Sequence, residues 1–217
     1  GTTATEIRHG KERKRWQIHL SDGKRIRAKI LVDGTELGDV AATVGAEALN
    51  DCRTVQDLTY VAVVKEYDHD VPMEMPEGYD IENYRNCCLN PLAENVGGNN
   101  PKGQKLWSPA QMLSYGRLPD GYRMINWPIA GNDFYADYLD MSPEERRQAF
   151  EQAKLRTLGF IYFIQHELGY TRIGIADDVF PTEDGLPFFP YFREARRIAG
   201  QDRMTVDAGV HADPFDR

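Results

Sequence analysis

The stretch Ile30-Leu-Val-Asp-Gly-Thr-Glu-Leu-Gly-Asp39 decides how the fold is interpreted. Three apolar residues run into Asp33-Gly34-Thr35, and Gly38 precedes Asp39 and a run of small residues. This pattern predicts a buried strand, a tight turn and a short helix over about residues 39–48. Glycine lets the backbone approach another group closely, and the N–H groups that begin a helix are suited to an anion. An ordinary strand-to-helix corner of an α/β layer has the same pattern.

The residue types in this stretch resemble those of a known family. Val32-Asp-Gly-Thr-Glu-Leu-Gly-Asp39 is similar to the (I/V)-D-A-T-x-x-G-D segment of bacterial FAD-dependent oxidoreductases, distant relatives of the fumarate-reductase flavoproteins. Far downstream, Pro190-Tyr-Phe-Arg-Glu-Ala-Arg-Arg-Ile198 resembles that family's P-Y-x-R-E-S-R-R-I segment. Gly34 replaces the family's usual Ala, and Ala195 replaces its usual Ser, which removes a hydroxyl. Three segments between them also resemble the family: Trp107-Ser-Pro-Ala-Gln-Met-Leu-Ser-Tyr-Gly116, Ile125-Asn-Trp-Pro128 and Ala176-Asp-Asp178.

The resemblance implies an FAD cofactor and flavin-mediated hydride transfer. It also implies that five residues of the opening stretch bind the cofactor: Asp33, Gly34, Thr35, Gly38 and Asp39. The sequence contains no G-x-G-x-x-G motif, which such a protein needs for the cofactor's pyrophosphate. We therefore expect the central piece of a longer enzyme, inactive by itself, that depends on missing N- and C-terminal segments of its own chain.

Composition limits the partners of this protein. Its 217 residues, 41% of them hydrophobic, can form one large domain or two small ones. A net charge of −8 without a basic block argues against nucleic acid, and no apolar run is long enough to span a bilayer. We expect a small-molecule substrate and a soluble protein. The sequence starts without an initiating Met or a signal peptide, which leaves the compartment open between cytoplasm and periplasm.

The patterning predicts an α+β fold of antiparallel and mixed sheets with one long buried helix. Residues 4–9, 16–20 and 25–32 are expected to form a three-stranded meander whose last strand enters a buried sheet. Residues 58–64 and 122–128 also have the composition of strands. The family resemblance implies that this α+β fold is part of a flavin-contacting layer plus the substrate domain of a two-domain flavoprotein.

The long helix has the clearest boundaries. Ser142-Pro-Glu-Glu145 provides an N-cap, a proline at the first position and a capping-box Glu, and Gly169 provides a stop. We expect a helix over about residues 143–168, buried along its apolar second half. Gly159 costs helix stability, which indicates close packing against another element. Ser108-Pro-Ala-Gln111 starts a shorter helix in the same way.

We divide the chain into three segments. Residues 1–50 hold the meander and the strand–turn–helix of the flavin-contacting layer. Residues 51–189 form the substrate domain with the long helix. Residues 190–217 return toward the flavin layer.

Three arginines in the return segment are the candidate catalytic residues. Arg193, Arg196 and Arg197 are suited to recognising carboxylate or phosphate, and the resemblance suggests that one or more faces the flavin or an anionic substrate. In a helix, residues 193 and 197 would share a face, and Glu194 could form an ion pair within the segment. The alternative is a salt-bridged segment that only anchors one layer to another.

The remaining chemistry is less specific. The five histidines lack ligand spacing, so we expect no metal site, and adjacent Cys87 and Cys88 are expected to be free thiols. Asp177 and Asp178 could act as paired carboxylates on a sugar, although neighbouring loop acids are usually solvated.

The alternative function is a glycan-binding or other non-catalytic α+β module. Its sugar-stacking residues would be the tyrosines and the three tryptophans, Trp16, Trp107 and Trp127.

Overall fold

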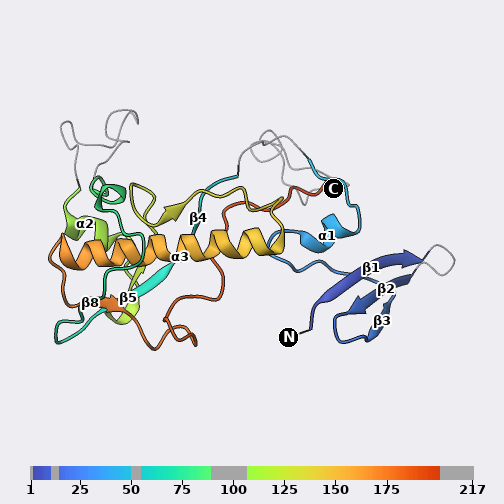
Figure 1. Cartoon of the computed structure of the whole chain (residues 1–217), viewed down its shortest axis with the longest axis horizontal. Coiled ribbons are helices and arrows are strands. Elements are labelled where there is room, and N and C mark those ends of the chain that lie inside the picture. The colour runs from blue at the N-terminus through green and yellow to red at the C-terminus, as the bar shows by residue number, and fades with distance from the viewer. Residues whose placement is uncertain (1, 11–14, 50–54, 89–106, 201–217) are drawn as a thin grey trace, which may run out of the picture. The chain divides into compact units, whose positions relative to one another are not determined.

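The computed structural model describes residues 2–10, 15–49, 55–88 and 107–200 (Figure 1). The chain divides into two compact units, Gly1–Arg53 with Glu194–Arg217, and Thr54–Arg193. The described strands form small antiparallel sheets, and the longest described helix lies in the second unit, so the fold is α+β. Within these ranges no helix is long and apolar enough to cross a membrane. Cys52 and the end of the return segment, residues 201–217, lie outside the described residues.

The first unit contains the predicted meander. β1 (Ala4–Gly10), β2 (Arg15–Leu20) and β3 (Arg25–Ala28) pair antiparallel in that order. A tight turn joins the last two strands, where Gly23 adopts a φ of 81° that the Asp-Gly sequence favours.

The predicted continuation of the third strand into a buried sheet is wrong. β3 ends at Ala28, and the side chains of Ile30 and Val32 are 77% and 80% exposed. The described residues provide no strand that pairs with residues 30–32. Because a strand needs a partner for its backbone hydrogen bonds, apolar composition alone does not make one.

The helix after the turn is shorter than predicted. α1 (Asp39–Thr43) ends because Gly45 adopts a φ of 76° and donates its N–H to Ala42 O, 3.0 Å away. Ala46 N donates to Ala41 O at 2.9 Å, which completes a Schellman stop. The predicted extension to residue 48 is wrong, because Gly45 ends the helix before that residue.

The described part of the second unit holds two sheets. One has the order β6 (Arg123–Ile125), β5 (Ala62–Glu66) and β8 (Ile173–Ile175), and the other pairs β4 (Leu58–Thr59) with β7 (Asp133–Phe134). The predicted strand over residues 58–64 is therefore split between the two sheets. Tyr60 lies at the break, and its carbonyl accepts hydrogen bonds from two side chains.

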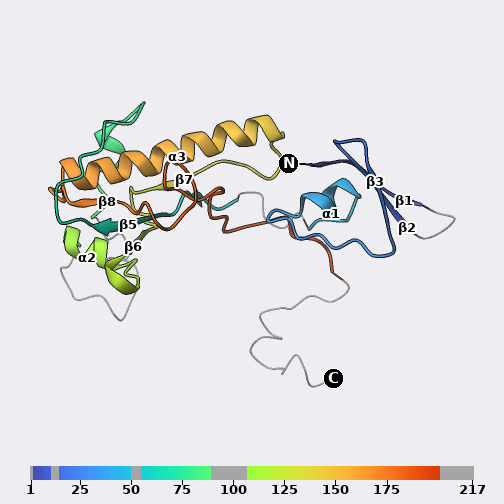
Figure 2. The ribbon, with the colours of Figure 1, turned by 90° about the horizontal axis from the view of Figure 1, so that it is seen from below.

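α3 (Pro143–His166) confirms the predicted long helix. The Ser142–Glu145 capping box is present, and most of its second half is buried. The helix contacts β4, β7 and β8, while α2 (Pro109–Ser114) contacts β6. Figure 2 shows the three-stranded sheet between α3 and α2. Among the described residues, two short 3-10 helices, Ile81–Asn83 and Pro119–Gly121, lie in the connections of this unit.

Gly159 packs closely on another element, as predicted. A Cβ atom at this position would lie 2.3 Å from Tyr84 Oη. Tyr84 is buried, stacks on Phe160 at 5.7 Å between ring centroids, and donates its hydroxyl to Arg156 O at 3.0 Å. The tyrosine therefore has little room to move aside.

We expect Gly159→Ala to destabilise the protein by about 2 kcal/mol, because overpacking outweighs the helix preference of Ala. Urea unfolding of the purified protein measures this change. In a Tyr84→Phe background, which lacks the colliding hydroxyl, the cost should be smaller. Gln152→Ala, at an exposed position of α3, is the control and should change stability by less than about 0.5 kcal/mol. A stabilising Gly159→Ala would contradict the packing described.

Candidate functional site

Six of the sequence-predicted site residues fall into two clusters, one in each unit, while Arg196 and Arg197 lie in the first unit outside both clusters. The first, which we call the Asp33 turn, comprises residues 33–39. The second, the Arg193 face, is formed by Arg193 and by the residues that its guanidinium contacts. We define its members as Asp57, Thr59, Asn126, Asp133, Tyr191 and Arg193.

The Asp33 turn is held by its own side chains. Asp33 Oδ1 accepts hydrogen bonds from Thr35 N at 2.8 Å and Thr35 Oγ1 at 2.6 Å. Asp33 Oδ2 accepts from Ala41 N at 2.7 Å, and Thr35 Oγ1 accepts from Asp39 N at 2.9 Å. The expectation that these helix-start N–H groups are open to an external anion is therefore wrong for Asp39 and Ala41.

These hydrogen bonds also change the pKa of the Asp33 carboxyl. Partial burial of the Asp33 carboxyl raises its pKa, but the hydrogen bonds from Thr35 and Ala41 outweigh burial and lower the pKa below the usual 3.8. Asp33 thus stays ionised as an internal cap of α1.

The two glycines of the turn have different surroundings. A Cβ atom added at Gly34 would meet nothing within 4 Å, so its backbone is open to close approach by another group. Gly38 adopts a φ of 70°, a conformation that side-chain-bearing residues rarely adopt. A Cβ atom there would lie 3.5 Å from Arg196 Cβ.

Arg196 ties the return segment to the Asp33 turn. Its Nη1 donates to Asp39 Oδ1 at 2.5 Å and to Leu37 O at 3.2 Å. Residues 194–200 are not helical, so the helical arrangement considered for the arginines does not occur. The ion pair between Arg197 and Glu194 nevertheless forms, at 3.0 Å.

Arg193 is the centre of the Arg193 face. Its Nη1 donates to Asp57 O at 2.6 Å and Thr59 Oγ1 at 2.9 Å. Its Nη2 donates to Asn126 Oδ1 at 2.9 Å and Asp133 Oδ1 at 3.0 Å. The four acceptors match the four hydrogens on the terminal nitrogens, so protein groups already use that end of the guanidinium.

Tyr191 and Asp57 complete the Arg193 face. Tyr191 exchanges backbone hydrogen bonds with Thr59, and the Arg193 guanidinium lies 5.3 Å from its ring centroid. Burial and the neighbouring charge of Asp133 raise the pKa of Asp57, while Arg193 opposes them. Within the described residues, no hydrogen bond reaches the Asp57 carboxyl. Sequence reasoning missed Asp57, because a single acid before a strand carries no motif.

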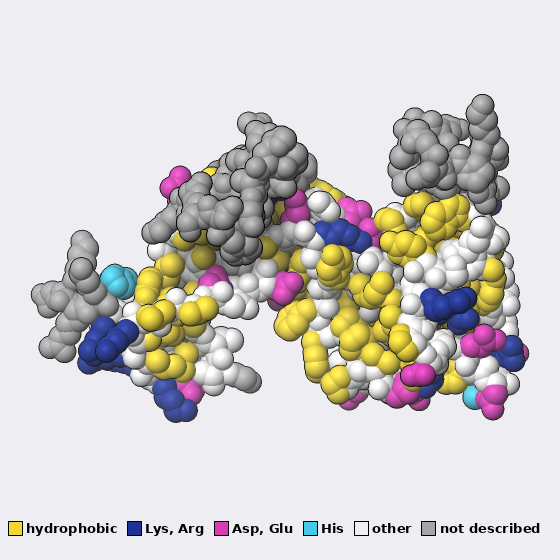
Figure 3. All heavy atoms as spheres, turned by 180° about the vertical axis from the view of Figure 1, so that it is seen from behind, with side chains coloured by type: hydrophobic (Ala, Val, Ile, Leu, Met, Phe, Trp, Pro, Cys, Tyr) yellow, Lys and Arg dark blue, Asp and Glu magenta, His cyan; other side chains and the backbone are white. Residues whose placement is uncertain are grey.

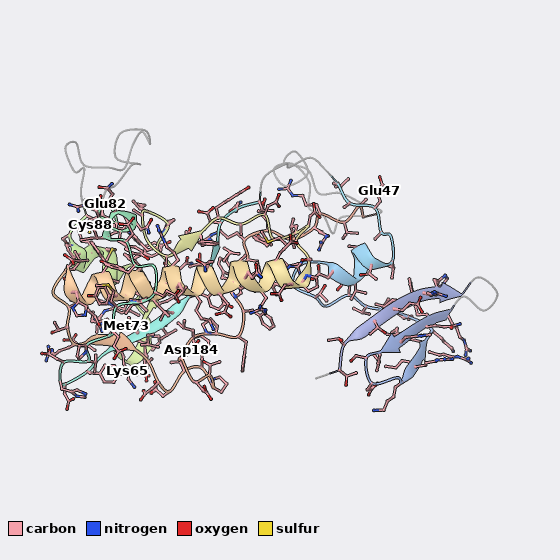
Figure 4. All side chains as sticks on the ribbon, viewed as in Figure 1. Glu47, Lys65, Met73, Glu82, Cys88 and Asp184 are labelled. Carbon is pink, nitrogen blue, oxygen red and sulfur yellow. The ribbon has the colours of Figure 1, made fainter. Side chains whose placement is uncertain are left out.

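Asp177 and Asp178 form a surface ion cluster. Lys65 Nζ lies 2.6 Å from Asp177 Oδ1 and 3.3 Å from Asp178 Oδ1, and Tyr122 Oη donates to Asp178 Oδ2 at 2.7 Å. The Lys65 hydrogen bond lowers the pKa of Asp177, and the Tyr122 hydrogen bond leads in lowering that of Asp178. Lys65 belongs to β5 and is labelled in Figure 4. Both carboxyls are stabilised as anions, which does not favour a general acid.

The tryptophans proposed for sugar stacking are mostly packed against protein groups. Trp127 is 4% exposed, lies 4.8 Å from Trp107 between ring centroids, and donates Nε1 to Cys87 O at 2.6 Å. Trp16 packs on His9 at 4.7 Å. Cys87 and Cys88 are free thiols, and the described residues contain no group of three or more side chains able to hold a metal.

Comparison with known proteins identifies one family. The family model described as FAD dependent oxidoreductase matches residues 1–216. No curated protein and no solved structure matches the chain.

We expect Asp33→Asn to destabilise the protein by about 1–2 kcal/mol at pH 7, because an amide NH2 would face an N–H donor. The folded-state pKa of Asp33 is lowered, so its contribution is fully present above the unfolded-state pKa of 3.8 and is lost as the pH falls from there through the lower folded-state pKa. The difference between wild type and variant should therefore narrow toward pH 3. Urea unfolding between pH 3 and 7 measures it, with Glu36→Gln in the same turn as control. A difference that stays constant with pH would contradict the proton-linked cap.

Proposed function

The chain belongs to the FAD dependent oxidoreductase family, and on this premise we propose that it supplies part of the flavin-contacting layer and the substrate domain of a two-domain flavoenzyme. The bound FAD would accept or donate a hydride, and the protein would supply position and electrostatics. The observation that carries the proposal is the family match, which extends over almost the whole chain.

The Asp33 turn fits a role beside FAD. Gly34 presents an open backbone surface, and the turn around it is fixed by Asp33, Thr35 and Arg196. We assign the cofactor contacts to Asp33, Gly34, Thr35, Gly38 and Asp39. Because the N–H groups of Asp39 and Ala41 are already used, the turn would line the cofactor rather than bind its pyrophosphate. The pyrophosphate would be held by a segment of the longer enzyme outside this sequence.

The three arginines receive different roles in this proposal. Arg196 positions the Asp33 turn, since it binds Asp39 and Leu37. Arg193 binds the Asp133 carboxylate and the backbone carbonyl of Asp57, and contributes a positive charge there. Arg197, whose side chain is 45% exposed, adds positive potential at the surface of the first unit.

The first test is flavin content. The native full-length protein should purify with flavin absorbance near roughly 450 nm, or gain it when FAD is added. A colourless, folded full-length protein that takes up no FAD would overturn the proposed function.

A variant at Gly34 tests the assigned contact. Since a side chain there meets no protein atom within 4 Å and Gly34 does not need a positive φ, Gly34→Leu should fold normally. We expect it to lose most of its flavin, at least about tenfold in FAD affinity, because the side chain would fill the space of approach. Ala42→Leu, at an exposed position of α1, is the matched control and should retain flavin. Full flavin content in Gly34→Leu would remove Gly34 from the cofactor site.

A further inference from the structure

Positive charge is concentrated at the start of the chain. Residues 1–32 contain nine Lys and Arg and three Asp and Glu, a net charge of +6. Residues 33–217 contain 17 Lys and Arg and 31 Asp and Glu, a net charge of −14. Most of the described residues in the basic segment belong to the β1–β2–β3 sheet. The overall charge of −8 therefore conceals a basic sheet in an acidic chain.

The strand register places the arginines of this sheet on one face. Side chains of residues paired across neighbouring strands share a face, and so do those of residues two apart in one strand. Gln17 pairs with Arg8 on one side and with Arg27 on the other. The face that contains them, which we call the basic face, carries Arg8, Arg15, Gln17, His19, Arg25, Arg27 and Glu6.

The opposite face of the sheet is mostly apolar. Its central row consists of Ile7, Ile18 and Ile26, and Trp16 pairs with Ala28 beside that row. In antiparallel sheets the apolar face is typically the packed one and the polar face the solvated one. Figure 3 shows Lys and Arg side chains as well as hydrophobic ones on the visible surface of the first unit. All four arginines of the basic face are exposed.

The basic face has little internal neutralisation. Glu6 is its one acid, and it forms an ion pair with Arg8 and lies 3.6 Å from His19 Nδ1. Within the described residues, the side chains of Arg15, Arg25 and Arg27 form no ion pair or hydrogen bond. With His19 neutral, the face has a net charge of +3, carried by guanidinium groups that are free to bind an anion.

We propose that the basic face binds an anionic lipid surface. Neighbouring strands lie about 4.8 Å apart, and side chains two apart on one strand lie about 6.8 Å apart, so the arginines form a nearly flat array. A layer of anionic lipid head groups is a flat array of the opposite charge. Several arginines can therefore contact such a layer at once without any change in the backbone.

Other acidic partners suit this face less well. Reading a duplex requires an element that enters a groove, and single strands stack their bases on aromatic side chains. The tryptophan of this sheet, Trp16, lies on the opposite face. A stable protein partner needs an apolar centre in its interface, which the basic face lacks. Attraction to head groups needs only the charges.

The acidic remainder of the chain is compatible with this binding. At physiological salt, charges more than about 8 Å from a surface are largely screened. The arginines in contact with the head groups thus act at full strength, while more distant acids contribute little. The same screening makes the binding sensitive to salt.

Co-sedimentation of the full-length protein with unilamellar vesicles tests the proposal. Phosphatidylcholine vesicles with about 30% phosphatidylserine should bind the protein, whereas pure phosphatidylcholine vesicles should not. Raising the NaCl concentration from about 0.05 to about 0.5 M should release it, because the Debye length shortens.

Variants of the three free arginines place the binding on the basic face. Arg15→Gln, Arg25→Gln and Arg27→Gln should each weaken vesicle binding about fivefold, and the triple variant should weaken it roughly 100-fold. Exchanging the same three arginines for lysine keeps the charge and should retain binding within about threefold. Because the positions are exposed, all of these variants should unfold at the wild-type urea midpoint or above it.

A matched control separates the basic face from net charge. Arg85, Arg147 and Arg172 lie in the second unit, their side chains are 59%, 61% and 53% exposed, and each forms an ion pair with a glutamate. Their combined change to Gln alters the net charge of the protein as much as the triple variant of the basic face does. It should leave vesicle binding at the wild-type level.

Several outcomes would overturn the inference. They are equal binding to neutral and anionic vesicles, binding that high salt does not release, and an equal loss in the control triple variant. Tighter binding of a DNA duplex than of the vesicles at the same salt would assign the face to nucleic acid instead. Self-association that depends on the three arginines, without vesicle binding, would assign it to a second copy. Flavin content is measured separately, so the proposed function and this inference can fail independently.

Discussion

Two buried side chains donate hydrogen bonds to one backbone carbonyl, and the rest of the larger unit depends on this interaction. Asn132 Nδ2 and Thr157 Oγ1 donate to Tyr60 O at 3.1 and 2.8 Å, and both residues are fully buried. The carbonyl is thereby satisfied without a ladder partner, so the strand ends and the chain passes from one sheet to the other. Asn132 also binds Trp127 N and Ile125 O, which fixes the end of β6. Without this break, β4 and β5 would be one strand, and the short sheet that carries the Arg193 face would not exist.

The three arginines of the return segment illustrate how similar residues acquire different roles. Arg193 is held in the second unit by Asp57, Thr59, Asn126 and Asp133, while Arg196 and Arg197 act in the first. A helix over residues 193–197 would have placed them on one face as a single charged cluster. Residues 194–197 are instead neither helix nor strand, and the three arginine side chains bind different partners. Charge clusters in a sequence therefore identify residue chemistry, whereas the backbone conformation decides which charges act together.

Local patterns predicted the parts of this fold that depend on local contacts. The capping boxes at Ser108 and Ser142 and the close packing of Gly159 were readable because each involves neighbours in sequence or a residue type with one strong cost. The break at Tyr60 depends on side chains 72 and 97 residues away, which no local pattern reveals. The same applies to Asp57, because its pKa is raised by burial and by the charge of Asp133, an increase that Arg193 opposes. The predicted strand over residues 30–32 is wrong for a related reason, since a strand forms only where another strand pairs with it.

The Asp33 turn shows what such a self-contained element can contribute to a cofactor site. Its acid, hydroxyl and helix start satisfy one another, and Arg196 closes the arrangement from the return segment. The shape of the turn is thus set without a ligand, and a cofactor that docks beside Gly34 need not meet the entropic cost of ordering it. The same hydrogen bonds leave the α1 start unable to neutralise a phosphate. A turn of this kind serves as a rigid wall, and affinity for the charged part of a dinucleotide has to come from other residues.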